Sequence, residues 1–362
     1  MTNRKPEDWV RPEIRALSAY HVPDSTGLIK LDAMENPYPW PSTLVREWQR
    51  ELKGITVNRY PDPQARALKD KLRETMRIPA SAGLLLGNGS DEIIQMLVMA
   101  VGGPWRTVLA PEPSFTMFRI ITTLCGSVYQ GAPLRAADFT LDEDAMCAAI
   151  RRHKPALIFI ANPNNPTGNR FDPKAIRAVI EAAPGLIVID EAYYPFSDGS
   201  CLEWLDEYEH LLIMRTVSKL GLAGLRLGLI AGGQGWLNEL EKTRLPYNIN
   251  VLTQVSAEFA LAHARVFAGQ AARIRTARAK LEEALRQIPG LTVYPSEANF
   301  ILFRTPAGRA GSIHDTLKSA GVLIKNLDGS HPALADCLRV TIGKPDENQA
   351  FMGALKTAIT QS

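Results

Sequence analysis

Hydrophobic residues follow two different patterns along the chain. Short continuous apolar runs, as in residues 156–160 and 186–189, are typical of strands that are covered on both faces. Between such runs, apolar residues recur at helical spacing, as Leu68, Leu72 and Met76 do. The alternation of the two patterns predicts a mostly parallel sheet wrapped by helices.

This alternation can be followed through the first two thirds of the sequence. It predicts strands at 84–86, 107–111, 127–133, 156–161, 186–189, 211–217 and 226–232. The helices predicted between and around them cover 42–53, 64–77, a segment from 90, 115–124, 142–152 and 173–183. Three more helices are predicted at 236–244, 251–268 and 271–288.

The pattern changes after residue 290. Short, mostly apolar segments at 291–294, 299–303, 322–325 and 337–343 predict strands, and they are combined with helices at 312–320 and from 346, which is an α+β arrangement. A chain of 362 residues also exceeds the size at which one hydrophobic core stops growing. The sequence therefore predicts an α/β protein, with a three-layer α/β/α large domain and a smaller α+β domain.

The domain boundaries follow from the same reading. Residues 1–40 end in a segment rich in proline and aromatic residues, which predicts an extended arm that packs across a surface. We expect the large domain to cover 41–250 and the small domain 251–362. The helix that begins at residue 251 is the expected bridge between them.

Composition and charge exclude several classes of partner. The net charge is +3, and basic and acidic residues are interleaved without a basic block, so a nucleic-acid partner is not indicated. No apolar run approaches the roughly 20 residues of a membrane span, and the first twenty residues lack the apolar core of a signal peptide. We therefore expect a cytoplasmic protein. The four cysteines and six histidines are scattered, which predicts reduced thiols and no metal site.

Polar side chains come directly after three of the predicted parallel strands. They are the amide of Asn165, the carboxylate of Asp190 with the phenol of Tyr193, and the amine of Lys219. The carboxyl ends of parallel strands meet at one edge of a sheet, and ligands bind there. We therefore expect these four side chains to face one site.

The stretch 215–228 places an amine beside an anion site. Thr216, Ser218 and Arg226 surround Lys219 in sequence, and hydroxyl and guanidinium groups are suited to a phosphate. This combination is what a pyridoxal-phosphate (PLP) enzyme needs, because the amine bonds the cofactor aldehyde while the phosphate anchors the ring. A single lysine after a strand is usually a solvated end, so this interpretation depends on the other residues.

A second anion site is predicted at the glycine turn before residue 90. Gly87 and Gly89 precede a helix that begins with Ser90 and Asp91, and a helix N-terminus presents free N–H groups to a phosphate. A plain strand-to-helix turn capped by serine explains the turn equally well. A dinucleotide site is disfavoured, because Glu92 occupies the position of the third glycine in that motif.

The remaining candidates complete a PLP site. Asp190 would keep the pyridine nitrogen protonated, Asn165 and Tyr193 would bind the ring oxygen, and Phe115 would stack on the ring. Each residue alone is better explained as a turn or core residue, but together they supply every group that such a site requires. Arg339, on an apolar strand, would bind a carboxylate or phosphate unless it lies on the wet face of an edge strand.

These residues carry a resemblance to a known family. Asn-Pro-Thr-Gly at 165–168, Asp-Glu-Ala-Tyr at 190–193, Ser-Lys at 218–219, Arg226 and Arg339 resemble the fold type I, aspartate-aminotransferase-like PLP enzymes over nearly the whole chain. Within that family, the segments similar to histidinol-phosphate aminotransferases are 32–38, 59–63, 87–92 and 338–343. Aromatic aminotransferases and threonine-phosphate decarboxylases share part of these segments.

The resemblance implies an activity. It is the PLP-dependent transfer of an amino group between histidinol phosphate and 2-oxoglutarate, which gives imidazole acetol phosphate and glutamate in histidine biosynthesis. Transamination of aromatic amino acids and decarboxylation of threonine phosphate remain alternatives on the same scaffold. A PLP-sensing regulator is the non-enzymatic alternative, and it would require an additional DNA-binding domain.

The resemblance also assigns roles to the residues. It implies that Lys219 is the Schiff-base lysine and proton shuttle, and that Asp190 and Tyr193 complete the catalytic set. It implies phosphate binding by Ser90, Asp91, Thr216, Ser218 and Arg226. It also implies that Tyr60 is supplied by the second subunit of a homodimer, and that the arm of residues 1–40 packs on the small domain and on that partner subunit. Substrate binding is implied for Arg339, Tyr20, Asn36 and Lys325. The chain departs from the family in having Met34 where asparagine is usual, and Lys325 would contribute a point charge rather than a planar fork.

Overall fold

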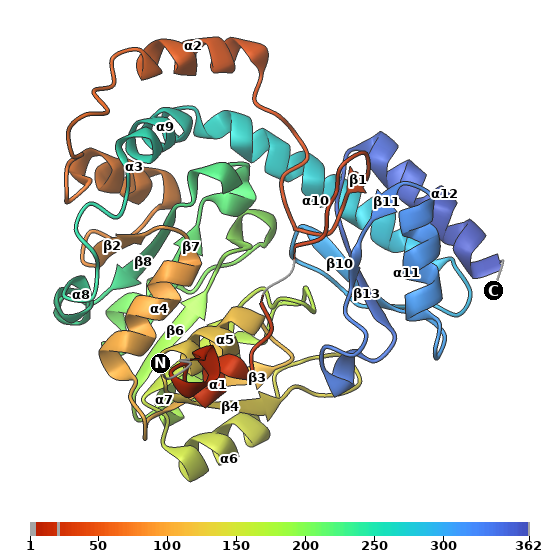
Figure 1. The fold of residues 1–362 in the computed structure, drawn as a ribbon, viewed down its shortest axis with the longest axis horizontal. Helices are drawn as coiled ribbons and strands as arrows, with labels where there is room; N and C mark the ends of the chain where they lie inside the picture. The colour runs from red at the N-terminus through yellow and green to blue at the C-terminus, as the bar shows by residue number, and fades with distance from the viewer. Residues whose placement is uncertain (1–4, 20–21, 361–362) are drawn as a thin grey trace.

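A central sheet of seven strands organises the larger part of the molecule (Figure 1). The computed structural model describes residues 5–19 and 22–360. The strand order is β2-β8-β7-β6-β5-β3-β4. The strands are β2 (Gly83–Gly87), β3 (Thr107–Glu112), β4 (Val128–Pro133), β5 (Leu157–Ala161), β6 (Leu186–Asp190), β7 (Leu211–Thr216) and β8 (Gly228–Gly232). Only β8 runs antiparallel to its neighbours, β2 and β7, so the predicted mostly parallel sheet is confirmed.

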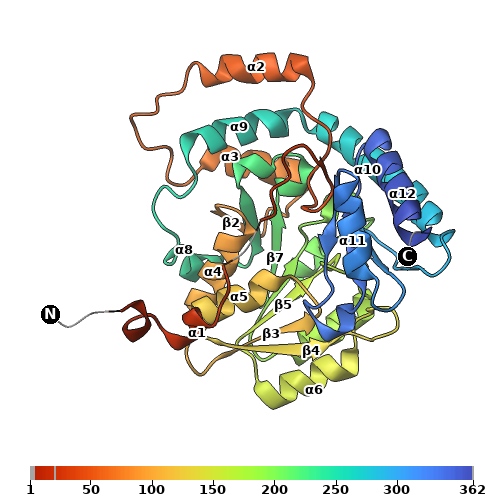
Figure 2. The ribbon, with the colours of Figure 1, turned by 45° about the vertical axis from the view of Figure 1, so that its right-hand side comes forward.

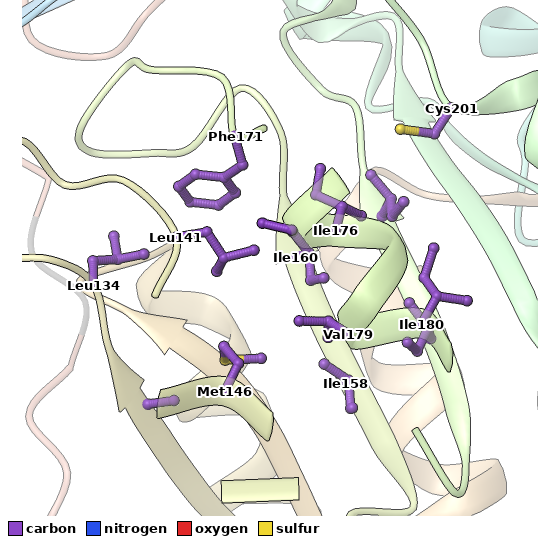
Figure 3. Packing of buried hydrophobic residues seen from close by; sticks show 14 of the residues in the cluster. Leu134, Leu141, Met146, Ile158, Ile160, Phe171, Ile176, Val179, Ile180 and Cys201 are labelled. Atoms are coloured by element: carbon purple, nitrogen blue, oxygen red, sulfur yellow. The ribbon is translucent and has the colours of Figure 1, made fainter. Parts of the chain in front are cut away.

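Helices cover both faces of this sheet. The helices on one face are α4 (Ser90–Val101), α5 (Thr116–Leu124) and α8 (Gln234–Glu241), and those on the other are α6 (Glu143–His153) and α7 (Pro173–Ala182). Strand β5 shows why the apolar runs are continuous: Leu157 and Phe159 pack on the first face, whereas Ile158 and Ile160 pack on the second. Figure 3 shows Ile160 beside Ile176 and Ile158 beside Val179, both of which belong to α7. The result is a three-layer α/β/α arrangement.

Another group of helices lies across the end of the sheet near β2 and β8. These are α2 (Ser42–Leu52), α3 (Arg66–Met76) and α9 (Val251–Ala262), and α9 contacts both others (Figure 1). The sequence predicts two helices at 251–268 and 271–288, and the boundary between them is wrong. The break lies at His263, and α10 (Ala264–Arg286) continues through Gly269 without interruption.

The smaller part contains a four-stranded antiparallel sheet. Its order is β12-β13-β10-β9, and its strands are β9 (Thr292–Val293), β10 (Phe300–Arg304), β12 (Lys325–Asn326) and β13 (Cys337–Thr341). Helices α11 (Ala310–Ser319) and α12 (Pro345–Thr360) pack on it together with α10, around apolar residues such as Phe303 and Phe351. The single strand expected at 322–325 is wrong. Residues Val322–Leu323 (β11) pair with residues 29–30 of the N-terminal segment and not with this sheet.

The N-terminal segment contacts both parts of the molecule. Strand β1 (Ile29–Lys30) pairs parallel with β11, and residues 31–41 then run as an extended segment towards α2. Helix α1 (Pro12–Arg15) lies against α5 (Figure 2), where Arg11 donates a hydrogen bond of 2.5 Å to the carbonyl of Leu124. Short 3-10 turns are η1 (Pro6–Asp8), η2 (Tyr194–Phe196), η3 (Leu202–Asp206), η4 (Ser218–Leu220), η5 (Ala223–Leu225) and η6 (Pro332–Leu334). No helix within residues 5–19 and 22–360 has the length and apolar character of a membrane span.

Candidate active site

A cavity of about 390 Å³ lies beyond the carboxyl ends of β5, β6 and β7. We call it the first cavity. The size is in the range of small-molecule sites. Ten residues predicted from the sequence line it, from five separate segments of the chain: Ser90, Asp91, Phe115, Asn165, Asp190, Tyr193, Thr216, Ser218, Lys219 and Arg226. The sheet edge therefore brings together the groups that the strand ends were expected to supply.

Lys219 lies in η4, directly after β7, and its side chain is partly buried. Burial lowers the pKa of the Lys219 amine to about 8, and the positive charge of Arg339 acts in the same direction. Its Nζ lies 5.8 Å from the centre of the Tyr193 ring. With this pKa about a tenth of the amine is neutral at pH 7, far more than for an ordinary lysine, so it can act as a nucleophile or a base.

Asp190 is the last residue of β6 and is 4% exposed. The backbone N–H of Ala192 donates a 3.0 Å hydrogen bond to its Oδ1. Burial raises the pKa of the carboxyl to about 7, although that hydrogen bond opposes the shift. Because a neighbouring cation would favour the charged form, a protonated ring nitrogen in the cavity is a suitable partner for this carboxylate.

Two chain segments, 89–91 and 216–226, form a polar surface at the side of the first cavity, which we call the cradle. Thr216 Oγ1 lies 2.8 Å from Ser218 Oγ, and Arg226 Nη2 lies 3.4 Å from Asp91 Oδ2. Ser90 is the first residue of α4, and Gly89 rather than Ser90 is its N-cap, so the serine cap considered from sequence is not formed. The hydroxyls, the guanidinium and the free N–H groups at the start of α4 are suited to a phosphate.

Glycines allow these two segments to approach closely. A Cβ on Gly228 would lie 2.7 Å from the carbonyl carbon of Gly89 and 2.8 Å from the nitrogen of Ser90. A Cβ on Gly89, which has a φ of 87°, would lie 2.7 Å from Arg226 Nη2. A larger residue at either position would displace the cradle.

Arg339 lies on β13 and is 6% exposed, so the alternative of a wet edge-strand face is wrong. It donates hydrogen bonds of 2.5 Å to Asn165 Oδ1 and 3.3 Å to the carbonyl of Asp32. Its neighbour in register on β12 is Lys325. Both basic residues line a second cavity of about 300 Å³, which shares Met34, Phe115 and Asn165 with the first. The second cavity can therefore receive the anionic end of a ligand whose other end lies in the first.

Two predicted site residues that the structure describes, Asn36 and Tyr60, line neither cavity. Asn36 donates hydrogen bonds to the carbonyl of Leu220 at 3.1 Å and to Gln270 Oε1 at 2.9 Å, so it fastens the extended segment beside Lys219. Tyr60 is 79% exposed and stacks on Tyr247. Tyr20 lies outside the described residues.

Sequence reasoning missed some residues that belong to these cavities. Met34 and Glu35 line the first cavity in place of Asn36, and Glu112 and His331 line the second. No strand-end rule indicates His331, because it lies in the segment between β12 and β13. Glu112 does end a strand, β3, and that position was a usable signal. No group of histidine, cysteine, aspartate or glutamate in residues 5–19 and 22–360 is arranged to hold a metal ion.

The residues present fit an aromatic cofactor that carries a phosphate. The cradle would hold the phosphate, the buried carboxyl of Asp190 would face a ring nitrogen, and Lys219 would reach an electrophilic carbon. Phe115 lines the same cavity and offers an aromatic face. Nonpolar walls and a few polar groups that converge from different segments are the usual composition of such a site.

Comparison with known proteins gives consistent results. A family model described as aminotransferase class I and II matches residues 26–355. "Histidinol-phosphate aminotransferase 2" of Nitrosococcus oceani is 56% identical over 356 residues, which cover 98% of this chain and 99% of that relative. The histidinol-phosphate aminotransferase of Chromobacterium violaceum is 51% identical over 350 residues, covering 97% and 98%.

A solved structure shares the fold. The crystal structure of histidinol-phosphate aminotransferase from Sinorhizobium meliloti in complex with pyridoxal-5'-phosphate has a TM-score of 0.86 and 22% sequence identity, and covers 98% of each chain. The predicted fold class, a three-layer part with a mostly parallel sheet and a smaller α+β part, is confirmed by this likeness.

Proposed function

The chain belongs to the class I and II aminotransferases, and we propose that it transfers an amino group between histidinol phosphate and 2-oxoglutarate as a step of histidine biosynthesis. The relatives that support this reaction are about half identical and match almost end to end. The observation that carries the proposal in the structure is the first cavity, where Lys219 and Asp190 face the same space as the phosphate cradle.

The cofactor is pyridoxal 5′-phosphate, which supplies the aldehyde that takes up the amino group and the ring that withdraws electrons. Lys219 would anchor that aldehyde and then move a proton at the α-carbon of the substrate. Its pKa of about 8 allows the neutral amine to accept that proton. Asp190 would hold a proton on the ring nitrogen, because a buried carboxylate is stable only beside a positive partner.

The other residues of the first cavity would bind and orient. Ser90, Asp91, Thr216, Ser218 and Arg226 would hold the phosphate, Phe115 would lie on the ring, and Asn165 and Tyr193 would bind the ring oxygen. The amide of Asn165 and the hydroxyl of Tyr193 lie 3.2 Å apart, so one acceptor can meet both. Arg339 and Lys325 would bind the phosphate of the amino donor or a carboxylate of the 2-oxo acid.

We further propose that two copies of the chain build each site together. Tyr60 is 79% exposed and stacks on Tyr247, with a ring-centre distance of 4.3 Å, yet it points into neither cavity of its own chain. An exposed stacked pair of aromatic rings is typical of an interface. In a homodimer Tyr60 would reach the partner's phosphate cradle, and Tyr20 and Asn36 belong to an arm, residues 1–40, that would close the site. A large domain of 41–250, a small domain of 251–362 and cytoplasmic residence complete this proposal.

The cofactor is tested by covalent labelling. The protein with PLP is reduced with borohydride, digested and mapped by mass spectrometry. The label is expected on Lys219 alone, and Lys219→Ala should remain unlabelled with an unchanged circular dichroism spectrum. A label on a different lysine would contradict the assignment of the site.

The substrate is tested by steady-state assays with 2-oxoglutarate as the acceptor. Histidinol phosphate should give the highest kcat/KM, ahead of phenylalanine. Preferred turnover of phenylalanine would show an aromatic aminotransferase instead. Release of carbon dioxide from threonine phosphate would show a decarboxylase, and PLP binding without any turnover would favour a sensor.

A further inference from the structure

The second cavity contains one feature that the binding of an anion does not explain. Among the described residues that line it, three are fixed cations, Arg119, Lys325 and Arg339, and only Glu112 is acidic. The side chain of Glu112 is 18% exposed. A carboxylate in a space that receives a phosphate weakens the binding of that anion unless the ligand also brings a group that pairs with the carboxylate.

Glu112 is held in place from several sides. Its Oε1 accepts a hydrogen bond from Arg119 of α5, and its Oε2 lies 3.8 Å from Nε2 of His331. The Nδ1 of His331 accepts a 3.1 Å hydrogen bond from the backbone N–H of Ala333, so the ring proton is on Nε2 and points towards Glu112. A Cβ on Gly131 would lie 2.3 Å from Glu112 Oε2, which shows that the carboxylate lies against the bare backbone of β4.

These contacts join the two sheets across the cavity. Glu112 ends β3 of the seven-stranded sheet, whereas His331 precedes η6 in the segment between β12 and β13. The carboxylate is therefore placed by both parts of the molecule and has little freedom to turn away. The hydroxyl of Tyr129 is also hydrogen-bonded to Glu112. A carboxylate has about four acceptor positions, and Arg119, Tyr129 and His331 occupy at most three of them, so one is left for a ligand.

The amino donor under the proposed function carries three recognisable groups. Its amine must meet Lys219, its phosphate suits Arg339 and Lys325, and its imidazole has an N–H donor. We propose that Glu112 determines specificity for the imidazole-bearing donor by accepting a hydrogen bond from that N–H. This inference rests on the proposed function, and it assigns the one ligand group that the cations of the second cavity cannot bind.

The same geometry explains how other donors would be rejected. An aromatic amino acid with a hydrocarbon ring would bury the Glu112 carboxylate against carbon and give it no donor. A site built to hydrogen-bond a substrate N–H discriminates strongly against an analogue that lacks it. The 2-oxo acid also lacks such a donor, so Glu112 should weaken its binding or leave it unaffected.

The test is the variant Glu112→Gln in the PLP-loaded enzyme, with Glu239→Gln as the matched control. Glu239 is an exposed residue of α8 that pairs with Lys242 and lines neither cavity. The kcat/KM for histidinol phosphate should fall about tenfold in Glu112→Gln, mainly through KM, because a hydrogen bond to a charged group is replaced by a neutral one. The kcat/KM of the glutamate half-reaction should stay within twofold or rise.

A second measurement separates recognition from a general disturbance of the cavity. Analogues of histidinol phosphate methylated on either ring nitrogen are compared in the wild-type enzyme and in Glu112→Gln. In the wild-type enzyme, kcat/KM for one of the two analogues should be about tenfold lower than for histidinol phosphate. In Glu112→Gln this difference between analogue and parent substrate should be smaller.

Each outcome gives a decision. Equal losses for histidinol phosphate and glutamate would show that Glu112 only positions Arg119 as an anion site, and would overturn the inference. An unchanged kcat/KM for histidinol phosphate would do the same while leaving the proposed reaction intact. Absence of turnover of histidinol phosphate by the wild type would overturn both. If Glu112→Gln does not fold, methylated analogues that both react as fast as the parent substrate with the wild type would still overturn the inference.

Discussion

The buried pair Arg215–Glu191 gives a stability prediction with an internal control. Arg215 donates hydrogen bonds of 3.0 and 2.8 Å to Glu191 Oε2, and the two side chains are only 3% and 2% exposed. The backbone N–H of Cys201 donates to the other oxygen of Glu191 at 2.5 Å, and the Arg215 guanidinium lies 4.1 Å from the Tyr194 ring centre. Replacing Glu191 with Gln keeps the volume but leaves the Arg215 charge buried without its counter-ion.

The expected cost of Glu191→Gln is about 3–5 kcal/mol of the free energy of unfolding, which is typical of a broken buried pair. The control is the pair Arg177–Glu207, which has the same chemistry: two hydrogen bonds, of 2.5 and 3.0 Å, and an aromatic ring, Trp204, 4.4 Å from the guanidinium. Its side chains are 33% and 48% exposed, so solvent screens the charges. Glu207→Gln should therefore change stability little.

The assay is urea unfolding of the apoprotein at pH 7, followed by circular dichroism. A midpoint that falls strongly in Glu191→Gln and hardly at all in Glu207→Gln is expected. The double variant Glu191→Leu with Arg215→Met should recover much of the loss, because it removes both charges together. If the two single variants have the same midpoint, burial does not decide the strength of these pairs and the reasoning is refuted.

Three further predictions concern the first cavity. Lys219→Met should stabilise the apoprotein by about 3 kcal/mol below pH 8, because folding lowers the pKa of Lys219 from 10.5 to about 8 and so disfavours its charged form. In urea unfolding experiments, this gain over wild type should vanish as the pH rises to 10.5. Asp190→Asn should weaken PLP binding in spectrophotometric titrations and yet stabilise the apoprotein above pH 7. That stabilisation should be absent below pH 4, since the pKa of Asp190 is raised from 3.8 to about 7. Gly228→Ala should lower PLP affinity at least tenfold by displacing Ser90, whereas Gly235→Ala, where a Cβ has nothing within 4 Å, should leave it unchanged.

Much of the fold and of the first cavity could be predicted because both obey local rules. A strand covered on both faces is apolar along most of its length, so β5, β6 and β7 are visible in the sequence. Parallel strands end at one edge, so Asp190 and Lys219 could be placed together without any tertiary information. The antiparallel direction of β8 could not be predicted in this way, because an apolar run has the same pattern whichever direction the strand runs.

The errors occurred where a tertiary contact decides between two local possibilities. Apolar positions continue on both sides of His263, so nothing local marks the end of α9 there. Residues 322–324 form a single apolar run that continues into Lys325, and nothing local divides it. In the structure β11 pairs with β1 whereas Lys325 pairs with Arg339, so the chain changes sheet at Ile324. Asn36 was placed in the site by resemblance, and its hydrogen bonds to Leu220 and Gln270 could be found only from the structure.

The buried ion pair Arg215–Glu191 next to the site could have been predicted from the alternation of side chains along a strand. Successive residues of a strand point to opposite faces, so the residue next to a cavity-facing side chain points into the protein. Asp190 and Thr216 face the first cavity, and their neighbours Glu191 and Arg215 meet on the other side of adjacent strands. A charged residue beside a functional one at the end of a buried strand must have a buried partner, and the nearest available partner is the corresponding residue of the next strand. The same alternation that brings Asp190 and Thr216 to the cavity therefore predicts the ion pair that fixes the ends of β6 and β7 relative to each other.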